Sequence, residues 1–337
     1  MRNGTRLGVV DVGSNAAQLL VVDGRTGSAP LASYSMKRPT GLADEIEADG
    51  ALSAEGVRRV VRATSAVVGR ARSLEVAELF VFATSAVRDA ANRDEVVDAI
   101  RAATGLRPQF LTGEDEARLT YHAVHRWYGW SAGRLLLLDI GGGTVEIVLG
   151  RDAEPELTMS LPLGAGRMTR NFLHADPPTD KQVRRVAKHV REGLREAVER
   201  LRWEGAFDRA IATSKTFKQL ARLAGAPPQS AGPFARRSLS VADLDHWIPQ
   251  LASRTRQDRA GLRGVSASRA GQIVGGAVVA RTMMTALGVR SVDVCPWALR
   301  EGIMLHQLQT SLSLTDPLAL RTVSPISDGD EETWQSR

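Results

Sequence analysis

Two segments of this chain share one pattern: strand-like apolar residues, an aspartate, a glycine turn and a second strand-like run. They are LGVVDVGSNAAQLLVV at residues 7–22 and LLLLDIGGGTVEIVLG at residues 135–150. After the glycines of the second segment, apolar residues recur with a period of two, which predicts a strand. A Rossmann or P-loop motif would require a helix there. Each segment therefore predicts a hairpin with an aspartate at the mouth of its turn.

The spacing of the two segments indicates an internal duplication. Aligned without gaps at an offset of 128, they place Asp11 on Asp139 and Gly13 on Gly141. A second repeat, VFATSAV at 81–87 and AIATSKT at 210–216, aligns its ATS triplets at an offset of 129. Because two separate motifs repeat at nearly one spacing, we predict two similar α/β halves. Their glycine turns would converge on one cleft and hold a phosphate from both sides.

The chain as a whole permits this plan. Its 337 residues are enough for two domains. No apolar run approaches the ~18 residues of a membrane span, and no signal-peptide core fits before the first strand. The lone Cys295 lies in an apolar segment, which is typical of a buried, inert thiol in a reducing compartment. We therefore expect a cytoplasmic protein without a membrane partner.

The charge is unevenly distributed. The chain carries a net charge of +6, but residues 311–337 hold five acids and two arginines, so residues 1–310 carry +9. A basic body suits an anionic ligand such as polyphosphate or nucleic acid. Because 39 of the 44 basic residues are arginine, genomic base composition is an equally simple explanation. The acidic, Ser- and Pro-containing segment 311–337 predicts a flexible tail.

Six motifs in this chain resemble the exopolyphosphatase and guanosine pentaphosphate phosphohydrolase (Ppx/GppA) family. They are DVGSN, FATSAVRDAANR, GEDEARLTYHAV, LDIGGGTVEIVLG, LPLGAGRMTR and ALREGIM. The resemblance covers about residues 6–308 and is closest to the short, two-domain members. The chain departs from the family pattern at Ala16, Thr144 and Gly271, and the first change removes a hydroxyl. Substrate preference within the family therefore stays open.

The resemblance implies an α/β, actin-like (ribonuclease H-like) duplicated fold with two domains around a central cleft. Domain I would span 1–128 with a returning helix at about 299–310, domain II would span 129–298, and 311–337 would be the tail. Within domain II, residues 181–203 predict one amphipathic helix. Its basic face is either a solvated surface or a guide for a long polyanion.

Hydrolysis of a terminal phosphoanhydride requires charge neutralisation, a positioned water and a base. Asp139 and Glu146, with Asp11 from the opposite hairpin, are the candidate ligands of Mg²⁺ or another divalent cation. Arg88 and Lys215 are candidate cationic contacts to phosphate. Backbone and hydroxyl groups of the two turns would also bind phosphate, namely those of Gly13, Ser14, Asn15, Gly141, Gly142, Gly143 and Thr144.

Glu116 is the candidate base. By the resemblance it matches the second glutamate of the family's EEAR motif, and GEDEARL predicts a glycine turn that opens a helix. Acids are also favoured in a first helical turn by the helix dipole, and we assign that structural role to Glu114 and Asp115. His122 and His125 lack a third ligand at suitable spacing, so packing or surface roles are favoured over zinc binding.

The resemblance thus implies an exopolyphosphatase that removes terminal orthophosphate from inorganic polyphosphate by in-line attack of water, with Mg²⁺. Within the family, the alternative is hydrolysis of the 5′ γ-phosphate of guanosine pentaphosphate, a stringent-response nucleotide. From other classes, an actin-like ATPase or sugar kinase and a non-catalytic sensor of polyphosphate or alarmone stay open. We expect no specific nucleic-acid partner. The sequence leaves the oligomeric state open, with a homodimer as one option.

Overall fold

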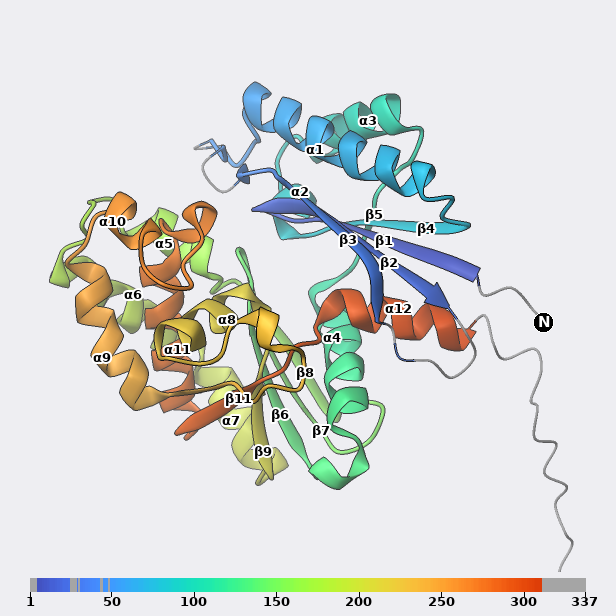
Figure 1. Ribbon diagram of the computed structural model, residues 1–337. Helices are drawn as coiled ribbons and strands as arrows, with labels where there is room; N and C mark the ends of the chain where they lie inside the picture. The colour runs from blue at the N-terminus through green and yellow to red at the C-terminus, as the bar shows by residue number, and fades with distance from the viewer. Residues whose placement is uncertain (1–4, 25–28, 30, 43–44, 48, 311–337) are drawn as a thin grey trace, which may run out of the picture.

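The computed structural model describes residues 5–24, 29, 31–42, 45–47 and 49–310 (Figure 1). Two mixed sheets, of five and six strands, form the centres of the two halves of the described chain. The predicted tail 311–337 lies outside the described residues. Within these residues, the search for a helix long and apolar enough to cross a membrane finds none.

The first sheet has the strand order β3-β2-β1-β4-β5. β1 pairs antiparallel with β2 and parallel with β4. Side chains alternate between the two faces of a strand, so Val10 packs toward the helices α1 and α3 while Val9 packs toward α12. Both faces of β1 are therefore buried. The strands are β1 Thr5–Val12, β2 Ala16–Gly24, β3 Ala32–Pro39, β4 Glu78–Ala83 and β5 Gln109–Phe110.

The second sheet has the order β10-β11-β9-β6-β7-β8. The leucines of β6 explain its apolar run, because Leu136 packs with Val274 of α11 and Leu137 packs with Tyr121 of α4, on opposite faces. The strands are β6 Leu135–Ile140, β7 Val145–Gly150, β8 Leu157–Leu161, β9 Arg209–Ala212, β10 Ser238–Ser240 and β11 Ser291–Val294.

Helices cover both sheets (Figure 1). In the first half they are α1 Ala54–Ser73, α2 Ser85–Arg88 and α3 Arg93–Thr104. Helix α4 Gly113–Tyr128 follows the first sheet in the chain but packs on β7 and β8 of the second sheet. In the second half they are α5 Ala165–Phe172, α6 Asp180–Gly193, α7 Arg195–Glu204, α8 Ser214–Leu223, α9 Val241–Ala252, α10 Arg256–Ala260 and α11 Ile273–Ala286. The last helix, α12 Leu299–Thr310, returns to pack on α4 and β1. The domain boundary at 128/129 stays a prediction.

The structure confirms the duplication at the level of backbone contacts. In the first hairpin Asp11 pairs with Gln18, and in the second Asp139 pairs with Glu146. Each turn is closed by one hydrogen bond, from Gly13 N to Ala16 O at 3.0 Å and from Gly141 N to Thr144 O at 2.9 Å. The ATS repeats also match, because β4 runs parallel to β1 and β9 runs parallel to β6.

The helix predicted at 181–203 is divided into α6 and α7 at Leu194. Gly193 lowers helix propensity at this point, and its missing side chain leaves room for Leu163, which lies 3.1 Å from the position of an added Cβ. Leu194 turns into the core with 1% of its surface exposed. The basic face of α6 is solvent-exposed, including Arg184 and Arg185.

Candidate active site

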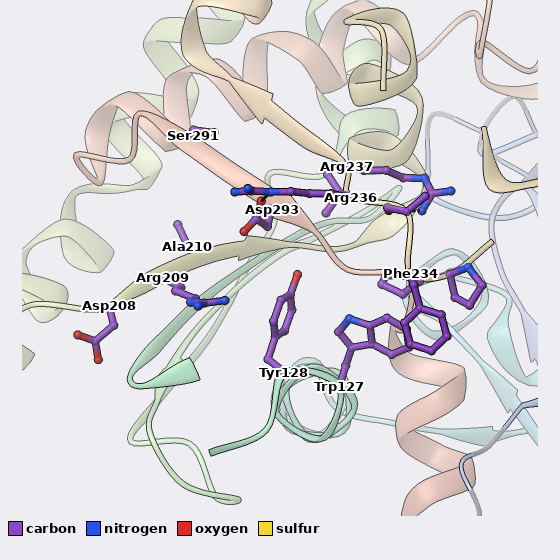
Figure 2. Close-up of a pocket in the computed structure, with 14 residues that line it drawn as sticks. Trp127, Tyr128, Asp208, Arg209, Ala210, Phe234, Arg236, Arg237, Ser291 and Asp293 are labelled. Carbon is purple, nitrogen blue, oxygen red and sulfur yellow. Dashed lines mark hydrogen bonds and ion pairs between the residues drawn. The ribbon is translucent and has the colours of Figure 1, made fainter. Parts of the chain in front are cut away.

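All but two of the predicted site residues, Arg88 and Gly143, line one cavity between the two sheets. A cavity of about 750 Å³ beside the end of α4 is lined by Trp127, Phe234 and Arg236, and its lining includes no predicted site residue (Figure 2). A second region, of about 590 Å³, is lined by both hairpins. It brings together Asp11, Gly13, Ser14, Asn15, Glu116, Asp139, Gly141, Gly142, Thr144, Glu146 and Lys215. We call this region the catalytic cavity.

The two glycine turns meet across this cavity. A Cβ atom added to Gly142 would lie 2.5 Å from Ser14 Oγ of the opposite hairpin. One added to Gly143 would lie 2.5 Å from Ser85 Oγ at the start of α2. Gly143 itself lines a neighbouring cavity of about 150 Å³ together with Arg167. The predicted convergence of the turns on one cleft is therefore confirmed. Gly143 lines the neighbouring cavity and not the catalytic cavity.

Supporting segments hold the carbonyl groups of the second turn. The start of α5 provides three N–H donors, from Ala165 to Gly141 O at 3.0 Å, from Arg167 to Gly142 O at 2.9 Å and from Gly164 to Gly143 O at 3.1 Å. In a trans peptide the N–H points opposite to the C=O. The N–H groups of Gly142, Gly143 and Thr144 therefore point away from α5.

The first turn is built in the same way. Leu42 N donates to Ser14 O at 2.7 Å, and Thr40 donates to Gly13 O and Asn15 O at 2.8 and 3.1 Å. The N–H groups that follow these carbonyls, of Ser14, Asn15 and Ala16, thus point away from the 40–42 segment. Both turns hold consecutive N–H groups in fixed directions, an arrangement that suits an anion.

Three carboxylates lie at the mouths of the hairpins, with Glu146 buried and Asp11 and Asp139 half-buried. Asp139 accepts a hydrogen bond from Thr213 Oγ1, and Glu146 accepts one from Ser160 Oγ at 3.1 Å. Asp11 Oδ1 is buried and has no hydrogen-bond partner among the described residues. Burial raises the pKa of Asp11 and of Asp139. Burial, with the charges of Asp139 and Glu116, raises the pKa of Glu146 to about 8.

These carboxylates fit a hard divalent cation, because uncompensated buried carboxylates with a free oxygen favour a positive charge between them. The described side chains do not form a complete metal site by themselves. In the described part of the chain, no cluster of three or more His, Cys, Asp and Glu side chains could hold a metal ion. Any cation here would therefore need waters or substrate oxygens to complete its coordination.

Glu116 lies in the first turn of α4 and pairs with Arg88 of α2. Arg88 Nη1 donates to Glu116 Oε1 at 2.8 Å and to Leu111 O at 2.8 Å, while Nε donates to Asp89 Oδ1 at 3.0 Å. Burial raises the pKa of Glu116 to about 7; the charge of Arg88 opposes this rise, and Asp11 adds to it. The lining of the catalytic cavity includes Glu116 and does not include Arg88.

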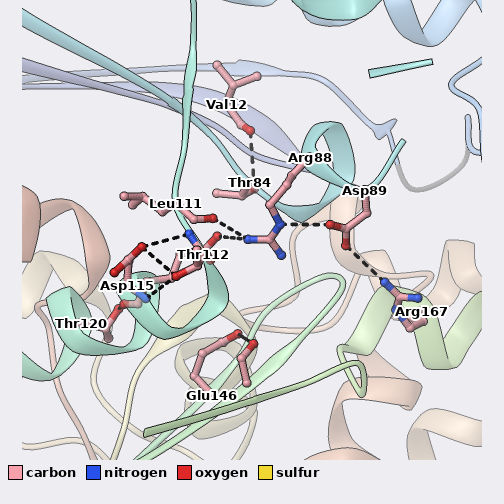
Figure 3. Close-up of polar contacts among 12 residues, drawn as sticks. Val12, Thr84, Arg88, Asp89, Leu111, Thr112, Asp115, Thr120, Glu146 and Arg167 are labelled. Atoms are coloured by element: carbon pink, nitrogen blue, oxygen red, sulfur yellow. Dashed lines mark hydrogen bonds and ion pairs between the residues drawn. The ribbon is translucent and has the colours of Figure 1, made fainter. Parts of the chain in front are cut away.

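The first turn of α4 also explains the other acids. Asp115 N donates to Thr112 Oγ1 at 3.1 Å, and Thr112 N donates to Asp115 Oδ2 at 3.3 Å, which forms a capping box (Figure 3). Asp115 is thus a capping residue, as expected. Glu114 is solvent-exposed. His125 is buried, with Nε2 3.0 Å from Arg151 O, in the packing role expected for it.

Three basic side chains of the cavity were not predicted as site residues, namely Lys37, Arg269 and Arg300, whereas Lys218 beside Lys215 was expected near the second turn. Burial and the nearby charge of Lys215 lower the pKa of Lys37 to about 8. Arg300 Nη1 donates to Gln18 Oε1 at 2.8 Å and so reaches the first hairpin from α12. The ALREGIM motif contained the signal for Arg300, whereas no sequence pattern singles out Lys37.

Comparison with solved structures places the fold. An exopolyphosphatase from Cytophaga hutchinsonii superimposes with a TM-score of 0.82 at 23% identity, over 91% of this chain and 98% of that one. A Ppx/GppA family member from Aquifex aeolicus gives a TM-score of 0.73 at 22% identity, over 91% and 99% of the two chains. The protein thus has the duplicated, actin-like α/β fold that these structures share.

Sequence comparison goes further. The model of the Ppx/GppA phosphatase family matches residues 20–311. The chain is 48% identical over 305 residues to Exopolyphosphatase 1 of Mycobacterium tuberculosis, covering 90% of this chain and 89% of that protein. It is 31% identical over 324 residues to Exopolyphosphatase 2 of the same species, covering 89% and 98%. The chain belongs to the Ppx/GppA phosphatase family.

Proposed function

We propose that this protein is an exopolyphosphatase, which hydrolyses the terminal phosphoanhydride bond of inorganic polyphosphate. One observation carries the proposal: a single cavity joins carboxylates, basic side chains and two glycine turns that meet at Gly142 and Ser14. The 48% identity to a mycobacterial protein named Exopolyphosphatase 1 supports this choice of substrate.

The terminal phosphate would bind between the two turns. Their N–H groups, directed away from α5 and from the 40–42 segment, are suited to equatorial phosphate oxygens. Lys215 and the Ser14 and Thr144 hydroxyls line the same cavity and are suited to the remaining oxygens. Arg269 and Arg300 add positive charge to the lining. This set would offset the charge that builds up on the phosphoryl group.

A divalent cation, with Mg²⁺ as the first choice, would be held by Asp139, with Glu146 and Asp11 as further ligands. Magnesium takes one or two carboxylates, keeps several waters and uses substrate phosphates as its other ligands. This coordination preference matches a site where the described side chains alone do not complete the coordination of a metal ion. When bound, the cation would supply charge neutralisation at the phosphate oxygens.

Glu116 would accept the proton of the attacking water. Its pKa of about 7 lies close to neutral pH, where a base is most effective, and Arg88 favours its charged form. Arg88 would then be a positioning residue, because its guanidinium is engaged by Glu116, Asp89 and Leu111 O. This role differs from the direct phosphate contact expected from the sequence.

One assay tests the proposal. Phosphate release is measured side by side from tripolyphosphate, long-chain polyphosphate, guanosine pentaphosphate and ATP, with and without Mg²⁺, and with Glu116→Gln as the control protein. We expect Mg²⁺-dependent release from the two polyphosphates that Glu116→Gln abolishes. Faster release from guanosine pentaphosphate would transfer the function to that nucleotide. ATP turnover that depends on a sugar acceptor would replace hydrolysis by a kinase reaction.

A further inference from the structure

A second cavity, of about 390 Å³, adjoins the catalytic cavity. Lys215, Lys218, Gln229 and Pro296 line both, so the two spaces lie side by side. The second cavity lies along α8, and residues of the 227–233 segment also line it. A ligand held at the glycine turns could therefore extend into it past Lys215.

The second cavity is lined by charges of one sign. Its lining contains Lys215, Lys218, Arg222 and Arg237, and no acidic residue is among its lining residues. The cavity beside α4 is different, because Asp208 and Asp293 accompany its arginines, and Arg236 Nε lies 3.4 Å from Asp293 Oδ1 (Figure 2). Of these two neighbours of the active site, the second cavity is therefore the one that suits an extended anion.

The fold fixes the two arginines of this cavity. Arg237 is only 9% exposed and donates to the carbonyl oxygens of Pro227, Pro228, Gly232 and Ala235, so it holds the 227–233 segment in place. Arg222 Nη1 donates to Ala226 O at 2.8 Å. The stem of Arg222 lies against Gly264, where an added Cβ would be 2.3 Å from Arg222 Cγ. Gly264 has a φ of +91°, which also favours glycine.

We propose that the second cavity binds the phosphates that follow the cleaved one in a polyphosphate chain, with Arg222 as the outer contact. This inference rests on the proposed exopolyphosphatase function. A linear polyanion matches a lining whose charged side chains are all basic. A nucleoside is a poorer match, because bases are held by stacking on aromatic side chains, and no aromatic residue is among the residues that line this cavity.

Arg222 is the residue to test, because it lines the second cavity and not the catalytic one. The variants are Arg222→Gln, Arg222→Lys and the control Arg184→Gln. Arg184 lies on the exposed basic face of α6, and no α6 residue is among those lining either cavity. Steady-state kcat and KM are measured with tripolyphosphate, long-chain polyphosphate and guanosine pentaphosphate at several salt concentrations, and Tm confirms folding.

For Arg222→Gln we expect KM for the long chain to rise about fivefold, the effect of one partly screened ion contact, with kcat unchanged. KM for tripolyphosphate should change less, because that substrate extends less far beyond the glycine turns. The salt dependence of KM for the long chain should become shallower, since one charge contact is gone. Arg222→Lys should retain most of the affinity, and Arg184→Gln should behave like the unmodified protein.

Several outcomes would overturn the inference. Equal effects on both substrates, or a loss of kcat, would mean that Arg222 is structural. A selective loss for the long chain in Arg184→Gln alone would assign the polyanion to the α6 face. A rise in KM for guanosine pentaphosphate alone would make the second cavity a nucleoside site. If the unmodified protein releases no phosphate from either polyphosphate, the proposed function fails first, which separates the two failures.

Discussion

The acids of the catalytic cavity differ in their partners, and their different roles follow from these partners. Asp139 and Glu146 accept hydrogen bonds from the neutral hydroxyls of Thr213 and Ser160. Glu116 accepts one from a guanidinium instead. A neutral partner leaves a buried carboxylate in need of a cation, whereas a cationic partner keeps it charged without one. This difference in partners supports the role of base that we propose for Glu116.

The first prediction separates the base from the cation ligand. Glu116→Gln keeps the shape of the side chain but removes its basicity, so kcat should fall by about 10²–10⁴ with little change in KM. Asp139→Asn should weaken catalysis and Mg²⁺ dependence together, because an amide is a poorer ligand for a hard cation. Titration of Mg²⁺ at saturating polyphosphate should partly rescue Asp139→Asn and leave Glu116→Gln unchanged.

Glu114→Gln is the matched control for Glu116→Gln, since Glu114 is an exposed acid in the same helical turn. It should retain normal kcat. A normal kcat in Glu116→Gln with a loss in Glu114→Gln would move the base to Glu114. If neither change matters, both are ordinary first-turn acids and the mechanism is wrong.

The second prediction concerns pH. Arg88 lowers the pKa of Glu116, which burial has raised to about 7. Its removal in Arg88→Ala should therefore raise that pKa further, and the acid limb of kcat/KM should move to higher pH because the base must be deprotonated. Arg88→Lys should shift the limb less, but it should still lower kcat because an ammonium cannot reproduce the fork that joins Glu116, Asp89 and Leu111 O.

The measurement is kcat/KM against pH for both variants. An acid limb that coincides with that of the unmodified protein would show that Arg88 does not control Glu116. A selective rise in KM for polyphosphate, without a change in the pH profile, would restore the direct phosphate contact that the sequence suggested.

At the scale of single residues, the sequence pointed to those cavity residues that lie within its own motifs. Asp11, Asp139 and Glu146 could be found because an aspartate beside a glycine turn is visible in a hairpin pattern. Lys37 could not, because β3 brings it to the cavity by pairing with β2, in a register where Lys37 faces Gln18. The partner of Arg88 was equally hidden, since Glu116 is 28 residues away and meets it only through the packing of α2 and α4.

Among the elements, α4 is the one whose start determines the geometry of the base. Glu116 N donates to Thr112 O at 3.0 Å, so the carboxylate leaves the helix one turn after the capping residue. The capping box of Thr112 and Asp115 therefore fixes both the start of α4 and the direction in which Glu116 projects.

The third prediction follows from this cap. Thr112→Ala removes the hydroxyl that accepts from Asp115 N, and it should lower the free energy of unfolding by about 1 kcal/mol. It should also reduce kcat severalfold, because the first turn of α4 frays where Glu116 begins. Thr112→Ser is the control and should retain both. Urea unfolding and phosphate release measure the two effects, and a stability loss without any change in kcat would show that the position of Glu116 does not depend on the cap.

Element prediction succeeded where one periodicity dominated. The hairpins and the helix that GEDEARL opens are found as expected, and so is the helix at about 299–310, which the family resemblance implied. The division of the 181–203 helix was missed, because its apolar stripe continues through Leu194 while the backbone does not. Gly193 was the available local signal, but the packing of Leu163 against it depends on the tertiary structure.

For the molecule as a whole, the decisive feature is the contact between its two halves. Gly142 approaches Ser14 and Gly143 approaches Ser85, and Arg167 of α5 reaches Asp89 beyond α2, with Nη2 to Oδ2 at 3.5 Å. The sequence predicted this convergence from the duplication. It could not predict how close the approach is, because that distance depends on the packing of all the elements behind the turns.

The last prediction tests whether that close approach is required for function. In Gly142→Ala the added Cβ would meet Ser14 Oγ at 2.5 Å and Ser14 Cβ at 3.4 Å. The two turns should be forced apart, so that KM for polyphosphate rises and kcat falls, while Tm changes little because the contact lies at the edge of the cleft. Gly69→Ala on α1 is the control, since a Cβ there meets nothing within 4 Å. Its kinetics should be normal.

A double substitution makes the test sharper. Ser14→Ala removes the Oγ and leaves only the ordinary 3.4 Å contact between Cβ atoms. If the defect of Gly142→Ala is steric, the pair Ser14→Ala and Gly142→Ala should have activity close to that of Ser14→Ala alone, and the double-mutant cycle should show strong coupling. Additive losses would mean that Gly142 acts without Ser14, through its own backbone. In that case the closeness of the two halves would not be what the phosphate site requires.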